Sequence, residues 1–372
     1  MRFVIFTHSL VSDWNHGNAH FLRGIASELI RRDHDVDVYE PENGWSRQNL
    51  LLEQGNAPIE EFSLKYPLLR TTYYDESTLN LTSVLKDAEV VIVHEWNTPT
   101  LVSAIGALRA KHDYQLFFHD THHRILTDRD NMSKVHLSEY DGVLAYGKVI
   151  RDAYREFGWA RQAWTWHEAA DTCVFHPMKQ TEREGDLVWI GNWGDDERAD
   201  SIREFLIKPV QALSLKARIY GVRYPQCALD QLAEAGIEYG GWLPNYLVPQ
   251  VFSRYRVTVH VPRLPYVKAL PGIPTIRPFE ALACGIPLVS APWVDSEKLF
   301  APGKDFLFAE SSEDMTKHLA RILNDDTLAG SLSRHGLETI KNRHTCAHRV
   351  DELLSIVQTP GLMSREVQQQ CA

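Results

Sequence analysis

Short apolar runs alternate with amphipathic stretches from the first residues onward. Residues 3–6 form an unbroken apolar run, which is typical of a strand buried on both faces. Residues 19–32 then repeat apolar side chains at three- and four-residue spacing, which predicts a helix packed along one side. A second strand is expected at 36–39. This order of strand, loop, helix and strand predicts a parallel α/β fold.

The alternation continues in two blocks with a break between them. Residues 41–80 show no clear period, so we expect irregular structure there. A charged stretch interrupts the pattern at about 172–185, and we predict a hinge between an N-terminal domain, 1–171, and a C-terminal domain, 186–345. Further strands are expected at 90–93, 116–118, 142–145, 163–166, 187–190, 217–220, 236–239, 257–261 and 288–290. Further helices are expected at 98–111, 148–157, 199–213, 245–255, 311–324, 326–342 and 348–357.

The composition agrees with a two-domain globular protein and disfavours some classes of binding partner. The chain has 372 residues, of which 44% are hydrophobic and 24% charged. A net charge of −10 disfavours duplex DNA, nucleic acid in general or an anionic membrane as the main partner. No stretch approaches the ~18 apolar residues of a membrane span. The five cysteines are scattered without metal-ligand spacing, which indicates a reducing, cytoplasmic compartment.

The stretch 271–291 carries the strongest local signal. Prolines and a glycine exclude regular structure before Thr275, and Pro278 can begin a helix that Gly285 ends. The free N–H groups and positive dipole end of this helix suit a phosphate. Glu280 lies in its first turn, where a carboxylate can accept hydrogen bonds from sugar hydroxyls. The alternative is that Glu280 merely complements the helix dipole.

Two further loops follow expected strands and carry glycine or positive charge. Gly191 and Asn192 follow the strand at 187–190, and Arg198 lies where this loop meets the next helix. Such a loop lets the backbone approach a phosphate, and an arginine can neutralise a diphosphate. Arg263 and Lys268 follow the strand at 257–261. With Arg277 they concentrate positive charge in an otherwise acidic chain, which favours a phosphate-binding role.

Polar clusters also end the strands at 90–93 and 116–118. Ligands bind at the carboxyl ends of strands in open parallel sheets, so the cluster at 119–124 is a candidate reaction centre. Two alternatives remain open. The cluster can be a solvated turn whose histidines cap a helix, or His119, Asp120 and His122 can bind zinc, although no fourth ligand has a local spacing.

These motifs resemble the GT-B glycosyltransferases, in particular the large retaining family known as group 1 or family 4. The second half of that family's Glu-x7-Glu pattern is similar to Glu280 and the following A-L-A-C-G-I-P-L-V-S, whereas Gly272 stands where the first Glu belongs. The form I-P-T-I-R-P-F-E-A and the run H-D-T-H-H are most similar to the spore-maturation CgeB-like branch. The step G-G-W-L-P at 240–244 resembles the family's base-contacting segment.

The resemblance implies a GT-B fold, with two doubly wound Rossmann-like domains facing across a cleft and a last helix, about 346–358, packed back on the first domain. It implies a hexosyltransferase-type enzyme that moves a sugar from a nucleotide-diphosphate donor to an acceptor hydroxyl with retention. The acceptor, a glycan, lipid or small molecule, stays open. The implied catalytic residues are His119, Asp120 and His122. The implied donor-binding residues are Gly191, Asn192, Arg198, Arg263, Lys268, Thr275, Arg277 and Glu280.

No metal and no cofactor beyond the sugar nucleotide are expected, because no Asp-x-Asp motif follows a strand and positive side chains can take over a metal's role. Three alternatives remain. A nucleotide-sugar epimerase of the same fold would need no acceptor. A catalytically inactive nucleotide-sugar-binding protein is compatible with the missing first Glu. A DNA-modifying glucosyltransferase is disfavoured by the net charge.

Overall fold

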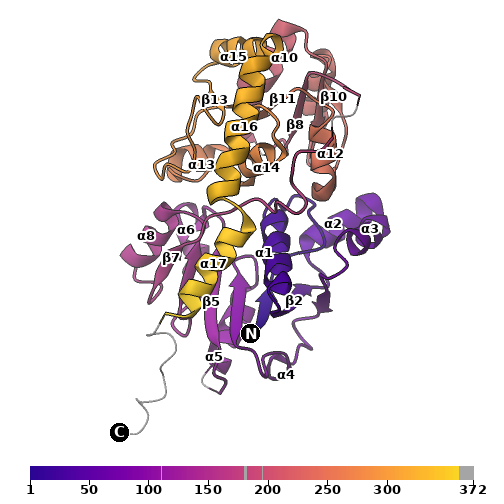
Figure 1. Cartoon of the computed structure of the whole chain (residues 1–372). Helices are drawn as coiled ribbons and strands as arrows, with labels where there is room; N and C mark the ends of the chain where they lie inside the picture. Colours follow the sequence, from indigo (N-terminus) through magenta and orange to yellow (C-terminus); the bar gives the residue numbers. More distant parts are fainter. Residues whose placement is uncertain (110, 180–181, 195, 360–372) are drawn as a thin grey trace. The chain divides into compact units, whose positions relative to one another are not determined.

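The computed structural model describes residues 1–109, 111–179, 182–194 and 196–359. Two compact units are distinguished by their internal contacts (Figure 1). Unit 1 comprises Met1–Ser12, Leu22–His167 and the chain from Cys346 onward. Unit 2 comprises Asp13–Phe21 and Glu168–Thr345. The short segment Asp13–Phe21 therefore packs with unit 2, although the expected boundary at 171 had grouped it with the first domain.

Unit 1 is built on a seven-stranded parallel sheet with the order β3-β2-β1-β4-β5-β6-β7. Its strands are β1 (Arg2–Phe6), β2 (Asp35–Pro41), β3 (Thr71–Tyr74), β4 (Val90–His94), β5 (Gln115–Asp120), β6 (Gly142–Ala145) and β7 (Ala163–Thr165). The chain runs outward from β1 in one direction and then returns to β4, so the topological switch lies between these two strands. All five residues of β4 are buried, as expected for a strand covered on both faces.

The helices of unit 1 flank this sheet. They are α1 (Ala19–Arg31, whose first turn belongs to unit 2), α2 (Trp45–Gln54), α3 (Ala57–Lys65), α4 (Leu81–Val84), α5 (Pro99–Leu108), α6 (Arg124–Thr127), α7 (Arg129–Met132), α8 (Lys148–Glu156) and α17 (Cys346–Val357). The last helix, α17, lies beside β5 and β7 (Figure 1), where Gln115 donates to the Val357 carbonyl and Trp166 to that of Arg349.

Unit 2 repeats the same winding with six parallel strands in the order β10-β9-β8-β11-β12-β13. The strands are β8 (Leu187–Ile190), β9 (Ala217–Tyr220), β10 (Glu238–Tyr239), β11 (Val257–His260), β12 (Leu288–Ser290) and β13 (Leu307–Phe308). The helices are α9 (Asp196–Ile202), the π-helical η1 (Arg203–Ile207), α10 (Lys208–Leu213), α11 (Gln226–Glu234), the 3-10 turn η2 (Asn245–Leu247), α12 (Val248–Phe252), α13 (Leu264–Ala269), α14 (Ile276–Cys284), α15 (Ser312–Asn324) and α16 (Asp326–Arg343). The switch lies between β8 and β11.

The structure confirms the expected parallel α/β class and corrects several elements. Residues 41–80 are not irregular, because they contain α2, α3 and β3. In α2 and α3 few side chains are buried, so the helical period is weak in the sequence. The helix expected at 199–213 is interrupted by η1, since Pro209 cannot donate to the preceding turn. The short helix α13 was not expected from the sequence.

Helix α14 begins at Ile276, two residues before the expected start. Pro278 is compatible with this start because N–H groups of a first helical turn have no partner inside the helix. Cys284 ends the helix, and Gly285 follows in the left-handed conformation with φ 68°, as expected. The strand β12 follows and is fully buried, which confirms the expected loop, helix and strand.

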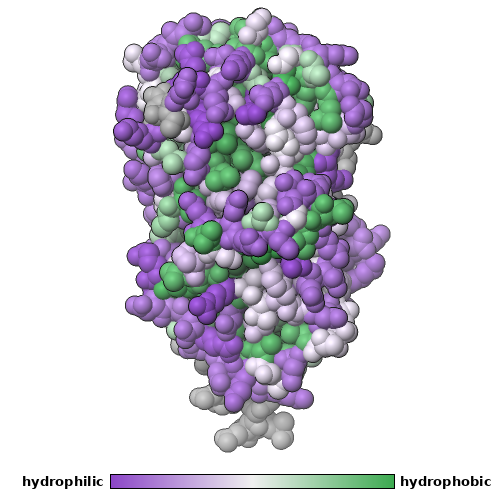
Figure 2. Space-filling model, turned by 90° about the vertical axis from the view of Figure 1, so that its right-hand side faces the viewer, coloured by the Kyte–Doolittle hydropathy of each residue, from purple (hydrophilic) through white to green (hydrophobic). Residues whose placement is uncertain are grey.

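Apolar side chains fill both units and are scattered on the surface. In unit 2 the core joins all of its long strands to α15 and α16 through residues such as Leu187, Val259 and Leu319. On the face drawn in Figure 2 hydrophobic and hydrophilic residues are interspersed. No helix within the described ranges is long and apolar enough to cross a membrane.

Helix α16 packs closely on α14 at Gly336, and this contact provides a test of the fold. A Cβ at position 336 would lie 2.6 Å from Cδ2 of Leu282 and 3.2 Å from the carbonyl oxygen of Asp305. We expect Gly336→Ala to lower the free energy of unfolding by about 1–3 kcal/mol through overpacking.

Gly330, on the same helix, supplies the matched control. A Cβ there would meet only the end of the Arg334 side chain, at 3.5 Å. Gly330→Ala should therefore raise the free energy of unfolding by about 0.5–1 kcal/mol, the usual gain from replacing a helical glycine. Urea unfolding of both variants measures the difference, and equal stability of the two would contradict the close packing.

Candidate functional site

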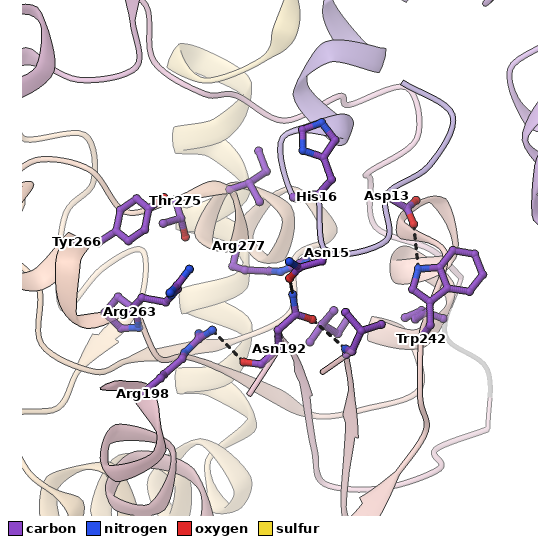
Figure 3. A pocket seen from close by; sticks show the side chains of 18 residues that line it. Asp13, Asn15, His16, Asn192, Arg198, Trp242, Arg263, Tyr266, Thr275 and Arg277 are labelled. Carbon is purple, nitrogen blue, oxygen red and sulfur yellow. Dashed lines mark hydrogen bonds between the residues drawn. The ribbon is translucent and has the colours of Figure 1, made fainter. Parts of the chain in front are cut away.

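A pocket of about 190 Å³ opens in unit 2 where the strand order reverses. Its walls include the ends of β8 and β11, the place at which open parallel sheets bind ligands. Figure 3 shows polar and aromatic side chains converging on it from several loops. The lining residues are Asp13, Asn15, His16, Gly17, Ile190, Gly191, Asn192, Arg198, Gly221, Val222, Trp242, Leu243, Pro262, Arg263, Tyr266, Thr275, Ile276 and Arg277.

The loop after β8 brings its backbone close to the backbone of the loop after β9. A Cβ at Gly221 would lie 2.1 Å from the carbonyl oxygen of Gly191, so position 221 requires glycine. Gly191 is held on both sides, because its N–H donates to the Tyr220 carbonyl at 2.9 Å and its own carbonyl accepts from the Tyr224 hydroxyl at 2.7 Å. Asn192 accepts from the Val222 N–H at 2.9 Å. This part of the wall is therefore rigid before any ligand binds.

Arg198 places a half-buried guanidinium in the pocket (Figure 3). Its Nη1 donates to the Asn192 carbonyl at 3.1 Å and its Nη2 donates to the Val261 carbonyl. The guanidinium carbon lies 5.0 Å from the centre of the Trp189 ring. Burial lowers the pKa of Arg198 to about 10, so the side chain is still positive at neutral pH. Nε is buried without a hydrogen-bond partner, and no carboxylate of the described residues forms an ion pair with Arg198.

The other two arginines of the pocket are paired with carboxylates. Nε of Arg263 lies 2.7 Å from Oε1 of Glu197, whose second oxygen accepts from the Leu264 N–H at 3.1 Å. Nη1 of Arg277 binds Oε2 of Glu280. Of the three cations, Arg198 therefore keeps the largest share of its charge for a ligand.

The amino end of α14 forms another wall. Thr275 precedes the helix with φ 65° and ψ 178°, a backbone conformation that β-branched residues rarely adopt. Thr275, Ile276 and Arg277 all line the pocket, so the positive end of the helix dipole faces it. Strain held at a pocket wall points to a functional constraint on this turn.

The segment Asp13–Phe21 supplies a further wall, whose residues were not among the expected site residues. Asp13 accepts from Trp242 Nε1 at 3.2 Å (Figure 3) and from the Asn245 N–H at 2.9 Å. Asn15, with φ 51°, accepts from the Asn192 side chain. These polar residues lie in a loop directly after the first strand, and that position was the available signal. The step G-G-W-L-P is in the pocket through Trp242 and Leu243.

Glu280 lies beside the pocket but does not line it. Its side chain is fully buried, with Oε1 accepting from Asn245 Nδ2 at 2.6 Å and facing His20 Nδ1 at 3.1 Å. Because His20 Nε2 accepts the Asp171 N–H, its proton is on Nδ1, toward Glu280. Burial alone would raise the pKa of Glu280, but the charge of Arg277 and the contacts with His20 and Asn245 outweigh burial and lower it. The carboxylate is therefore ionised at neutral pH and engaged within the protein.

Of the eight expected donor-binding residues, six line this pocket: Gly191, Asn192, Arg198, Arg263, Thr275 and Arg277. Glu280 contacts it through Arg277. Lys268 does not line it, because its side chain is exposed in the last turn of α13.

The expected catalytic residues lie in unit 1, at the carboxyl end of β5. His119 is fully buried, with its ring 5.3 Å from that of His94 and 4.9 Å from that of Trp166. Burial lowers the pKa of His119 to about 3, so the imidazole is neutral. Asp120 is also buried and accepts from the His122 N–H at 3.0 Å and the Tyr154 hydroxyl at 2.7 Å. His122 is half-buried and is the nearest of the three to solvent.

Comparisons with known proteins identify the fold. Residues 198–355, less than half of the chain, match the model of a family described as glycosyl transferase-like. No curated protein matches the chain. Sucrose-phosphate synthase from Thermosynechococcus elongatus is similar over 96% of this chain and 98% of its own, at 13% identity and a TM-score of 0.64. The likeness shows that the chain has the GT-B fold, as expected.

Two further solved structures are similar. Anabaena HepE, determined with UDP and glucose, has 12% identity and a TM-score of 0.68 over 96% of this chain and 100% of its own. The T4 phage protein BGT, determined with UDP and Mn²⁺, has 13% identity and a TM-score of 0.62 over the same shares. At these identities the likeness concerns the fold alone.

The position of Glu280 generates a pH-dependent prediction. We expect Glu280→Gln to lower the free energy of unfolding at pH 7 by about 1.5–3 kcal/mol, the usual contribution of a hydrogen bond to a charged group. A carboxyl whose folded pKa is depressed stabilises the protein above its unfolded pKa, here about 4.5, and loses this contribution as pH falls through the folded value. The deficit should therefore shrink below about pH 4.5.

Urea unfolding at pH 7 and at successive values below pH 4.5 measures this deficit. Glu338→Gln is the control, because Glu338 is exposed on α16 and should change stability little at any pH. A deficit of the same size at every pH would show that the lost contribution does not depend on the ionised carboxylate.

Proposed function

We propose that this protein is a glycosyltransferase that takes its sugar from a nucleoside diphosphate donor bound in the unit 2 pocket. The observation that carries the proposal is Arg198, a half-buried cation without a carboxylate partner among the described residues, beside the amino end of α14. A half-buried charge in this position is best explained by an anionic ligand. The glycosyl transferase-like match of residues 198–355 and the UDP-bound structures of similar fold support a nucleotide sugar.

The walls of the pocket suit the parts of such a donor. The diphosphate would lie between Arg198 and the N–H groups at the start of α14, which are preorganised donors for negative charge. The base would lie toward Trp242 and Leu243, beside the Gly221–Val222 backbone. Asp13 and Asn245 fix this region, since both oxygens of Asp13 are already engaged. Glu280 would position Arg277, and a ribose contact of its own would require it to exchange one of its present partners.

The arrangement of charges also suits the chemistry of sugar transfer. In sugar transfer the bond between the anomeric carbon and the donor's β-phosphate oxygen breaks, and the acceptor oxygen forms a new bond to that carbon. Negative charge develops on the leaving diphosphate, where Arg198 and the α14 dipole would stabilise it. The acceptor hydroxyl passes its proton to an oxygen of the leaving diphosphate, so no further co-reactant is needed. We assign acceptor binding to the polar edge of unit 1 at His122, with His119 and Asp120 as buried supports.

Several finer features belong to the same proposal. We propose transfer of a hexose with retention, membership of the CgeB-like branch, a cytoplasmic location and turnover without a metal ion. Independence from metal is supported by Arg198 and the positive end of the α14 dipole, which bring positive charge to the place where a cation would otherwise neutralise the diphosphate. The acceptor would be a molecule with a hydroxyl group, and a nucleic acid is disfavoured by the charge of −10.

The role of Arg198 can be tested by binding of UDP. Arg198→Ala should weaken UDP binding by about tenfold to a hundredfold, since a charge-assisted hydrogen bond contributes about 1.5–3 kcal/mol. Lys268→Ala is the control, because Lys268 carries the same charge on α13 but lies outside the pocket lining. Calorimetry measures affinity, and melting curves check that each variant is folded. Equal affinities of wild type and Arg198→Ala would exclude the pocket as the diphosphate site.

Metal independence predicts that EDTA leaves turnover unchanged. The donor for the assay is the nucleotide sugar that raises the melting temperature most, because a bound ligand stabilises the folded state. Release of UDP or another nucleoside diphosphate is then measured before and after treatment with EDTA. Loss of activity with recovery on addition of Mg²⁺ or Mn²⁺ would show that the arginines do not replace a metal.

A further inference from the structure

An exposed tryptophan stands at the polar edge of the unit 1 sheet. Trp96 follows β4 directly and is 43% exposed, although its neighbours His94 and Glu95 are both buried. Large aromatic side chains bury most of their surface unless another molecule covers them. The site residues assigned to the donor do not include Trp96, and no step of the proposed transfer uses it.

Two neighbouring side chains, those of Arg124 and His122, hold the ring of Trp96 in place. The guanidinium carbon of Arg124 lies 4.1 Å from the ring centre, a cation–π contact. Arg124 is itself fixed, because its Nη2 donates to the Glu95 carbonyl at 2.8 Å and to Glu95 Oε2 at 3.1 Å. The His122 ring meets Trp96 edge to face at 5.0 Å. The indole therefore has a fixed orientation, which lowers the entropy lost on binding.

This arrangement rests on two buried carboxyl groups. Glu95 Oε1 accepts from the N–H of Thr121 at 3.0 Å and from its hydroxyl at 2.8 Å. Asp120 accepts from the His122 N–H and the Tyr154 hydroxyl. Burial first, and then the charge of Asp120, raise the pKa of Glu95 well above its usual range. Because Glu95 and Asp120 bind the backbone of the turn at 121–122, they fix the loop that carries His122 and Arg124.

We propose that Trp96 is the stacking platform for a sugar ring of the acceptor, which makes the acceptor a carbohydrate or a glycoconjugate. The assignment to the acceptor rests on the proposed function. One face of a pyranose presents C–H groups, whose partial positive charge matches the negative face of an indole. Its hydroxyl groups lie at the rim of the ring, within reach of polar side chains such as those of His122 and Arg124.

The surroundings favour a sugar over other flat or apolar ligands. A nucleic acid needs several cations along its backbone, but near Trp96 the exposed carboxylate of Glu76 accepts from the Thr98 hydroxyl at 2.8 Å and adds negative charge. A lipid needs a continuous apolar surface, whereas Arg124 and His122 place polar atoms against Trp96. A ring with an apolar face and a polar rim fits both features.

The test compares Trp96→Ala with Trp45→Ala in the full-length protein. Trp45 is the matched control, since it is 46% exposed in the same unit but begins α2 and belongs to no contact described for Trp96. Labelled wild type and variants are applied to an array of defined neutral and acidic oligosaccharides, and affinities for the retained glycans are measured by titration. We expect Trp96→Ala to bind at least about tenfold more weakly, in the range of a lost aromatic contact, and Trp45→Ala to bind as wild type does.

UDP affinity of the same three proteins separates this inference from the proposed function. We expect it to be equal in all three. Absence of UDP binding in wild type, with glycan binding that depends on Trp96, would refute the donor pocket and leave the sugar platform. Equal glycan affinity of wild type and Trp96→Ala, retention of no glycan, or Trp96-dependent binding of a single-stranded oligonucleotide in place of glycans would each overturn the platform. Melting curves verify that Trp96→Ala is folded.

Discussion

The buried carboxylate of Glu280 is the interaction on which the unit 2 pocket depends. It joins three segments that are far apart in the sequence, because His20, Asn245 and Arg277 all face its two oxygens. An ionised group without water is stable only when its lone pairs are occupied, so the three partners must stay together. The segment Asp13–Phe21, the segment that carries Asn245 and the start of α14 are thereby fixed relative to one another. Removing one partner would leave a buried charge uncompensated and loosen the whole wall.

The same pairing decides how charge is distributed over the pocket. Glu280 neutralises much of the charge of Arg277, and Glu197 much of that of Arg263. Arg198 instead donates to the backbone carbonyls of Asn192 and Val261. Carbonyl dipoles orient a guanidinium without cancelling its charge. A pocket with three paired arginines would attract a diphosphate weakly. In a pocket with three unpaired arginines the three positive charges would repel one another. Because only one of the three arginines, Arg198, lacks a carboxylate partner among the described residues, the pocket keeps a positive charge beside the α14 dipole without strong repulsion among its arginines.

Most of the fold could be predicted because buried parallel strands are continuous apolar runs, as at β4 and β8. Loops at strand ends brought six of the eight expected donor-binding residues to the pocket lining. Glu280 lies beside the lining, because helical position does not reveal which buried partners a carboxylate meets. Lys268 lies outside it on the short helix α13, which was not expected. The contribution of Asp13 and Asn15 depends on packing with residues more than 170 positions away, which no local pattern encodes.

Gly272, the departure from the family pattern, is explained by the packing around it. Its φ of 96° suits glycine, and a Cβ there would lie 2.8 Å from Cγ and Oε1 of Glu297 and from Oγ of Ser296. Its N–H donates to the Val294 carbonyl at 2.6 Å, so the loop before α14 is tied to the loop after β12. A glutamate at 272 would meet both a strained backbone and an existing carboxylate. The conformation of this loop therefore requires glycine at position 272. The turn that brings Thr275 to the pocket depends on this conformation, and the absence of the Glu is a consequence of it.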